Sequence, residues 1–68
     1  MIATAKLRGI IAERGLSQRD VAKAIGVTDK TFYAKMKRGV FDSDEMATMV
    51  SLLNIEHPAE VFFADFGA

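Results

Sequence analysis

Apolar residues recur at intervals of three and four positions along the whole sequence, and no stretch alternates as a half-buried strand would. The period is clear at Leu7 and Ile11 and again at Met46 and Val50. The chain has 68 residues and no cysteine, so neither a disulfide nor a thiolate zinc site can stabilise it. It must therefore rely on a single apolar core, and we expect one compact all-α domain over residues 1–68.

Capping residues divide this pattern into five helices. Side chains that favour helix N-termini stand at Ser17, Thr28 and Asp42. Residues that favour left-handed C-caps stand at Gly15, Gly26 and Asn54. Pro58 suits the first turn of a fifth helix, expected over about 58–66. Gly9 lies inside the first helix, where it is interpreted as permitting the close approach of another helix or as mere tolerance.

The charges are segregated along the chain, although their sum is zero. All nine basic residues precede Gly39, against three acidic ones, so the first forty residues carry a formal charge of +6. The residues from Phe41 onward contain six acidic residues and no basic one. This split suggests a molecule with one basic side, although solvated helix faces could also sort in this way. Four cations are interpreted as solvated or as steering phosphates: Arg8, Arg14, Lys35 and Arg38.

The most informative segment covers residues 17–36, where two short helices are joined by a turn of three to four residues that contains Gly26. Val21, Ile25 and Phe32 would fix both helices to the body of the protein. The opposite side of the second of these helices is short and polar at its start and basic at its end. A helix that enters the major groove needs small side chains near base edges and cations near phosphates. The spacing therefore favours a DNA-binding helix-turn-helix over an all-α module whose turn serves only packing.

A particular set of residues carries a family resemblance: Gly15–Gln18, Val21–Ala22, Ile25–Val27, Thr31–Phe32 and Met36. With these residues the chain resembles the Cro/lambda-repressor-like (XRE-type) helix-turn-helix family, including its short phage and mobile-element members. Lys35 departs from the pattern, because many relatives carry Trp or Leu there. The resemblance implies a five-helix lambda-repressor-like domain. It also implies a sequence-specific double-stranded DNA-binding transcriptional regulator, expected to be a repressor, that reads the major groove with its third helix.

The resemblance also implies roles by position. Gln18 matches the residue that commonly braces a DNA phosphate and the recognition helix, and Ser17 caps the same helix beside it. Arg19, the next residue, is a further candidate for contact with DNA. The groove-facing positions of the third helix are Thr28, Asp29, Lys30, Tyr33 and Lys37.

Several alternatives stay open within this set. Lys30 and Tyr33 are the strongest candidates for base contact, and Thr28 and Lys37 for phosphate or the groove edge, with plain solvation as the alternative. Asp29 could accept a hydrogen bond from cytosine N4, orient Lys30 or Arg19, or only support the helix dipole.

The C-terminal aromatic residues suggest a second surface. Phe62 and Phe63 diverge by about 100° on a helix, so one is expected to close the core while the other stays partly exposed. We take Phe62, Phe63 and Phe66 as candidate homodimer contacts, since a dimer would read two half-sites. The alternative is that the aromatics simply fold over the core. A rival function is a protein-interaction module that binds another regulator through this acidic, aromatic C-terminal surface.

Other classes of function find no support in the sequence. His57 is the only histidine, no glycine-rich phosphate loop is present, and the serines lack partners at triad positions. We therefore expect no enzyme, no cofactor, no metal site and no small-molecule ligand. The apolar runs are too short to cross a membrane and no signal peptide is recognisable, so a cytoplasmic location is expected.

Overall fold

Five helices form between residues 2 and 63, the part of the chain that this computed structural model describes. They are α1 (Thr4–Glu13), α2 (Gln18–Ile25), α3 (Asp29–Arg38), α4 (Ser43–Leu53) and α5 (Pro58–Phe62). No strand occurs in these residues, which confirms the expected all-helical class. The last helix ends at Phe62, and residues 64–66 of its expected range lie outside the described part of the chain.

The expected N-terminal caps set the helix boundaries. Ser17 and Asp42 each form a capping box, in which the cap side chain accepts from a backbone N–H three residues on. The carboxylates of Asp20 and Glu45 accept from the backbone N–H of the cap residue in return. Thr28 caps α3 by accepting a hydrogen bond from the N–H of Thr31. These local bonds satisfy donors that a helix leaves free at its start.

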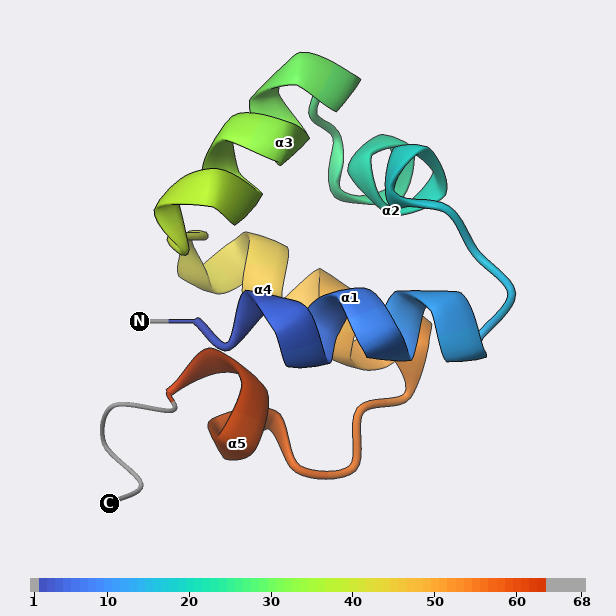
Figure 1. The fold of residues 1–68 in the computed structure, drawn as a ribbon, viewed down its shortest axis with the longest axis vertical. Coiled ribbons are helices and arrows are strands. Elements are labelled where there is room, and N and C mark those ends of the chain that lie inside the picture. The colour runs from blue at the N-terminus through green and yellow to red at the C-terminus, as the bar shows by residue number, and fades with distance from the viewer. Residues whose placement is uncertain (1, 64–68) are drawn as a thin grey trace.

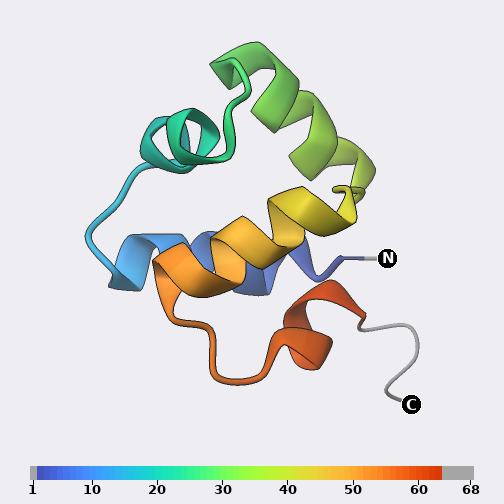
Figure 2. The ribbon, with the colours of Figure 1, turned by 180° about the vertical axis from the view of Figure 1, so that it is seen from behind.

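The helices are arranged with α3 at one end of the molecule and α5 at the other (Figure 1). Helix α2 contacts α1, α3 and α4, whereas α5 contacts α1. The N-terminal segment ties two distant parts together, because the N–H of Ile2 donates to Gly39 O at 3.1 Å and that of Ala3 to Val61 O at 2.7 Å. Seen from behind, α4 crosses in front of α1 and α3 again forms the outer edge (Figure 2).

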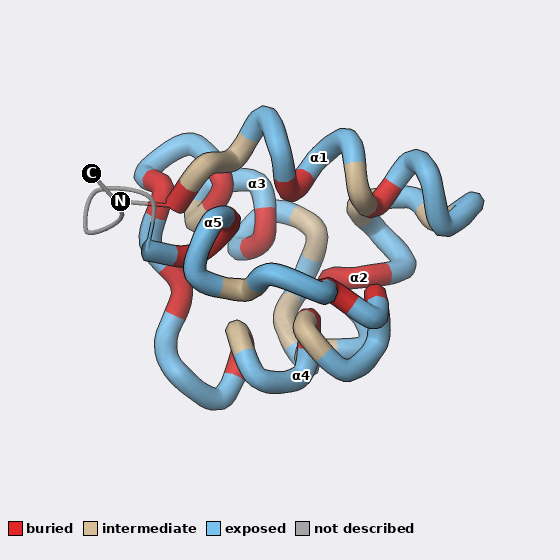
Figure 3. The backbone as a smooth tube through the Cα atoms, turned by 90° about the horizontal axis from the view of Figure 1, so that it is seen from below, coloured by how far each residue is buried: buried red, intermediate tan, exposed pale blue. Residues whose placement is uncertain are grey.

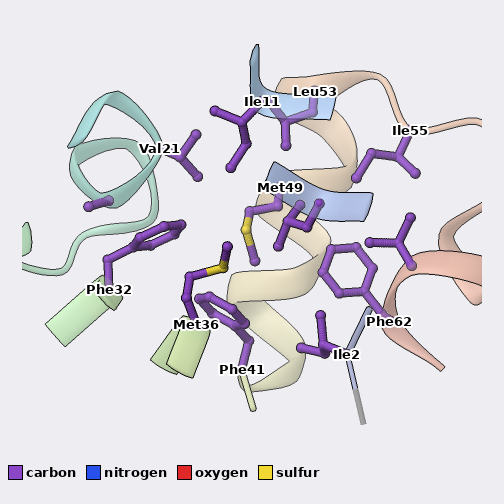
Figure 4. Packing of buried hydrophobic residues seen from close by; sticks show 13 residues of the cluster. Ile2, Ile11, Val21, Phe32, Met36, Phe41, Met49, Leu53, Ile55 and Phe62 are labelled. Carbon is purple, nitrogen blue, oxygen red and sulfur yellow. The ribbon is translucent and has the colours of Figure 1, made fainter. Parts of the chain in front are cut away.

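A single apolar core joins all five helices, and the buried positions lie along their inner sides (Figure 3). Phe32 from α3 packs beside Phe41, with ring centroids 5.5 Å apart. Met49 of α4 lies near the middle of the cluster (Figure 4). The buried apolar residues are Ile2, Leu7, Ile11, Val21, Ala22, Phe32, Met36, Phe41, Met49, Leu53, Ile55, Val61 and Phe62. The core therefore fixes the inner sides of α2 and α3 and leaves their outer sides in solvent.

No helix among the described residues is both long and apolar enough to cross a membrane.

Gly9 does not serve a close helix approach. It is exposed in the middle of α1, and a Cβ built on it would meet nothing within 4 Å. The interpretation that it admits another helix is therefore wrong for the described residues, and its conformational freedom only weakens α1.

Replacing Gly9 by alanine is expected to stabilise the fold by about 1 kcal/mol, because alanine restricts the unfolded chain and fits the helix without a clash. The melting temperature should rise by roughly 4–8 °C in thermal unfolding followed by circular dichroism. Gly15→Ala is the matched control. Gly15 has a φ of 74°, where an alanine costs roughly 1–2 kcal/mol, so its melting temperature should fall. A fall for Gly9→Ala would contradict this account.

Candidate nucleic-acid interface

Helices α2 and α3 are joined by a short turn that the sequence defines closely. Gly26 adopts a φ of 83°, a left-handed conformation that glycine adopts without steric cost. The N–H of Val27 then donates to the carbonyl of Ala22 at 3.0 Å, which closes the end of α2. In Figure 1, α2 is seen nearly end-on while α3 lies in the plane of the view, so the two axes cross steeply.

The N-terminal end of α2 is held by the capping box at Ser17. The Ser17 N–H donates to Asp20 Oδ2 at 2.8 Å, and Ser17 Oγ accepts from the Asp20 N–H at 3.1 Å. The backbone hydrogen bond from Ser17 lowers the pKa of the Asp20 carboxyl, and the Ser17 side chain adds to this effect. Gln18, the first residue of α2, is half-buried at this end. Both candidate residues therefore lie at the start of α2, as expected.

The outer side of α3 carries three of the candidate residues. Lys30, Tyr33 and Lys37 are spaced by three and four positions, so they share one side of the helix, which is distinct from the side that buries Phe32 and Met36. Tyr33 is 52% exposed, and its ring meets only the edge of the neighbouring Phe32 ring, at 6.4 Å between centroids. None of the three side chains forms a hydrogen bond or ion pair with another described residue, although Tyr33 interacts electrostatically with Arg19. Their polar ends are therefore available to a ligand.

Thr28 and Asp29, at the start of α3, are engaged within the protein. Thr28 Oγ1 accepts from the Thr31 N–H at 3.2 Å and donates to Thr31 Oγ1 at 3.0 Å. Asp29 Oδ2 accepts from Arg19 Nε at 2.8 Å, which links the start of α3 to the start of α2. The hydrogen bond and the charge of Asp29 raise the pKa of Arg19 above its already high ordinary value. All eight sequence-predicted residues thus lie on α2, α3 or their caps, but these two have local partners as well.

Two basic residues interpreted as solvated or phosphate-steering also have structural roles. Arg14 Nε donates to the carbonyl of Leu53 at 2.7 Å, so this side chain satisfies the C-terminal end of α4. Lys35 Nζ lies 3.0 Å from Glu45 Oε1, and both side chains are largely buried. Glu45 also accepts the N–H of Asp42, so the pair connects α3 to the first turn of α4. Both cations therefore have partners within the protein, although Arg14 is still exposed, whereas Lys35 is mostly buried beside Glu45.

The C-terminal aromatic residues separate into core and surface, as expected. Phe62 is only 4% exposed and closes the core beside Ile2, whereas Phe63 is 46% exposed. Phe66 lies outside the described residues. A shallow apolar hollow of about 210 Å³ forms here, lined by Ile2, Gly39, Val40, Phe41, Met46, Phe62 and Phe63. Of the candidate dimer contacts, Phe63 therefore offers the largest exposed surface in the described part of the chain.

Val40 also lines this hollow, which was not predicted from the sequence. Its side chain is 55% exposed, next to the left-handed Gly39 that ends α3. The sequence feature that could have indicated it is an apolar residue directly after the glycine that ends α3, outside the apolar face of any helix.

A second, larger hollow lies between α1 and the segment that leads into α5. It measures about 350 Å³ and its charged lining includes Lys6, Glu13, Glu56 and Glu60. His57 lies here as the N-cap residue of α5, but its side chain makes no capping hydrogen bond. No group of three or more potential metal ligands gathers anywhere in residues 2–63.

The structure defines an all-α domain of five helices with an exposed, partly basic α3. Comparison with models of known protein families, with curated proteins and with solved structures finds no match to this chain. Its function must therefore be inferred from its own residues.

Proposed function

We propose that this protein is a sequence-specific double-stranded DNA-binding transcriptional regulator, acting as a repressor. In this proposal α2 and α3 form a helix-turn-helix of the lambda-repressor type, and α3 enters the major groove. The observation that carries it is the outer side of α3, where Lys30, Tyr33 and Lys37 are exposed and unpaired within the described residues. The other side of the same helix is anchored in the core by Phe32 and Met36.

The dimensions and charge of α3 support this role. An α-helix with its side chains is about 10–12 Å across and the major groove is about 12 Å wide, so α3 can enter it. Its ten residues span about 15 Å, which brings several side chains near base edges. Lysines at both ends of the exposed row can reach phosphates or guanine acceptors. The positive charge of the first forty residues would favour the approach of DNA to this part of the molecule, within the range that salt allows.

Repression would work by occupancy, since a protein seated on an operator excludes polymerase from it. The proposal also implies a cytoplasmic location, in the compartment that holds the DNA.

The test is selection of bound sequences from a random duplex library by the wild-type protein. The proposal predicts an enriched motif whose affinity falls steeply with salt, because phosphate contacts release counterions. A palindromic motif would indicate two copies on two half-sites. Recovery of no preferred sequence would overturn the proposal.

A second candidate function is protein binding through the C-terminal surface, where the other regulator would dock. The apolar hollow beside Val40 and Phe63 favours it, because exposed apolar side chains gathered together often mark an interaction site. This candidate predicts no enriched duplex in the same selection, so one experiment separates the two functions.

A further inference from the structure

The ion pair between Arg19 and Asp29 is the contact that joins the start of α2 to the start of α3. Arg19 is the second residue of α2 and Asp29 is the first of α3, and Arg19 Nε lies 2.8 Å from Asp29 Oδ2. The Arg19 side chain is 78% exposed and that of Asp29 is 39% exposed. The pair therefore lies at the surface, on the same two helices as the proposed DNA-binding residues.

The Arg19 guanidinium forms one hydrogen bond, from Nε to Asp29, and interacts electrostatically with Tyr33 and Asp20 as well. A guanidinium has five N–H groups, and here only the one on Nε is bonded to a described residue. The two Nη groups keep their donors for another acceptor, and the planar fork of arginine matches the oxygens of a phosphate. A long side chain that is already anchored loses less freedom when it binds. The ion pair thus holds a cation by its Nε beside the start of α3, with the rest of the side chain exposed.

The same contact changes the interpretation of Asp29. An oxygen of its carboxylate already accepts from Arg19, so the orientation of an arginine is favoured over hydrogen bonding to cytosine N4. A carboxylate that only faced DNA would repel the phosphates. In the ion pair, the negative charge of Asp29 is balanced by the positive charge of Arg19.

We propose that Asp29 is a positioning residue, which holds the Arg19 guanidinium at the edge of the helix-turn-helix so that its Nη groups bind a backbone phosphate of duplex DNA. This inference rests on the proposed function and identifies a phosphate contact within it. It also predicts whether removal of the Asp29 carboxylate strengthens or weakens DNA binding. Removal of a negative charge beside DNA should strengthen binding by simple electrostatics, whereas loss of a positioning residue should weaken it.

The experiment measures affinity for the duplex that the wild-type protein enriches, at several salt concentrations, for Asp29→Asn, Arg19→Ala and the double variant. Arg19→Ala should weaken binding about tenfold and reduce the slope of log affinity against log salt by about one. Asp29→Asn should weaken binding about fivefold in the wild-type background, and should cause no further loss when Arg19 is alanine. Asp29→Glu, which restores a carboxylate, should recover part of the affinity.

Three results would overturn the inference while leaving the proposed function intact. Tighter binding by Asp29→Asn in both backgrounds would show that its carboxylate only repels DNA. An equal loss in both backgrounds, with a changed base preference, would show that Asp29 reads a base. An unchanged salt slope for Arg19→Ala would show that this residue binds no phosphate.

Thermal unfolding of each variant checks that the fold survives. Asp29→Ser provides a second removal of the carboxylate at a position in the first helical turn. It should give the same loss of affinity, and normal binding by this variant would overturn the inference. If the wild type enriches no duplex at all, the proposed function fails and this inference fails with it.

Discussion

Replacing Lys30, Tyr33 and Lys37 together by alanine is expected to weaken binding to the enriched duplex by at least about 100-fold. Each side chain that contacts a base contributes about 1–3 kcal/mol, and three such losses exceed the roughly 2.8 kcal/mol that a 100-fold change requires. Since two of the three are lysines, the salt dependence should also become less steep, by up to about two in the logarithmic slope. The substitutions lie on the exposed side of α3, so the melting temperature should change little.

The matched control removes an equal number of positive charges, two, from another helix. Lys6→Ala/Arg8→Ala alters two exposed residues of α1, and its affinity should stay within about threefold of the wild type, because salt screens distant charges. Equal losses in the two variants would mean that total charge, and not the α3 surface, determines binding. Normal binding by the triple variant would show that α3 is not the recognition helix. Fluorescence anisotropy of a labelled duplex measures the affinities of the triple variant and of the control.

Phe32→Ala is expected to remove most of the stability of the domain. Phe32 is fully buried and packs beside Phe41, so its truncation leaves a cavity that costs about 3–5 kcal/mol. A chain of 68 residues has a total stability of only about 3–10 kcal/mol, estimated from its length. The variant should therefore unfold at a much lower temperature, or be largely unfolded at room temperature, as circular dichroism would show.

Tyr33 provides the matched control for this prediction, because it is the neighbouring aromatic residue on the same helix. Its side chain is 52% exposed, so Tyr33→Ala should change stability by no more than about 0.5 kcal/mol. A comparable loss of stability in both variants would contradict the assignment of the two sides of α3.

The helix boundaries could be predicted because capping is local. Ser17 and Asp42 each meet a partner three residues away, and Gly26 and Asn54 adopt the left-handed conformation at helix ends that their residue types favour. Periodicity likewise predicted that Phe32 and Met36 would be buried. These features depend on neighbours that are close in the sequence.

The roles of Arg14 and Lys35 could not be predicted in the same way. Arg14 bonds a carbonyl 39 residues away, and Lys35 pairs with a glutamate on the next helix. Both contacts depend on how α4 packs against the earlier helices, which no periodicity reveals. The exposure of Val40 also depends on packing, since it follows from the route of the chain after Gly39.

The charge segregation has a more limited meaning once these contacts are known. Lys35 is neutralised by Glu45 and Arg19 is paired with Asp29, so part of the positive charge of the first forty residues is already balanced. The unpaired Lys30 and Lys37 on the outer side of α3 are the charges that support the proposal of DNA binding.

The central claim is tested most directly by the random-duplex selection, carried out in parallel with the wild-type protein and with Lys30→Ala/Tyr33→Ala/Lys37→Ala. We expect the wild type to enrich a defined motif and the folded triple variant to enrich none. Enrichment of the same motif by both proteins would contradict the recognition role of α3, and enrichment of nothing by the wild type would contradict DNA binding itself.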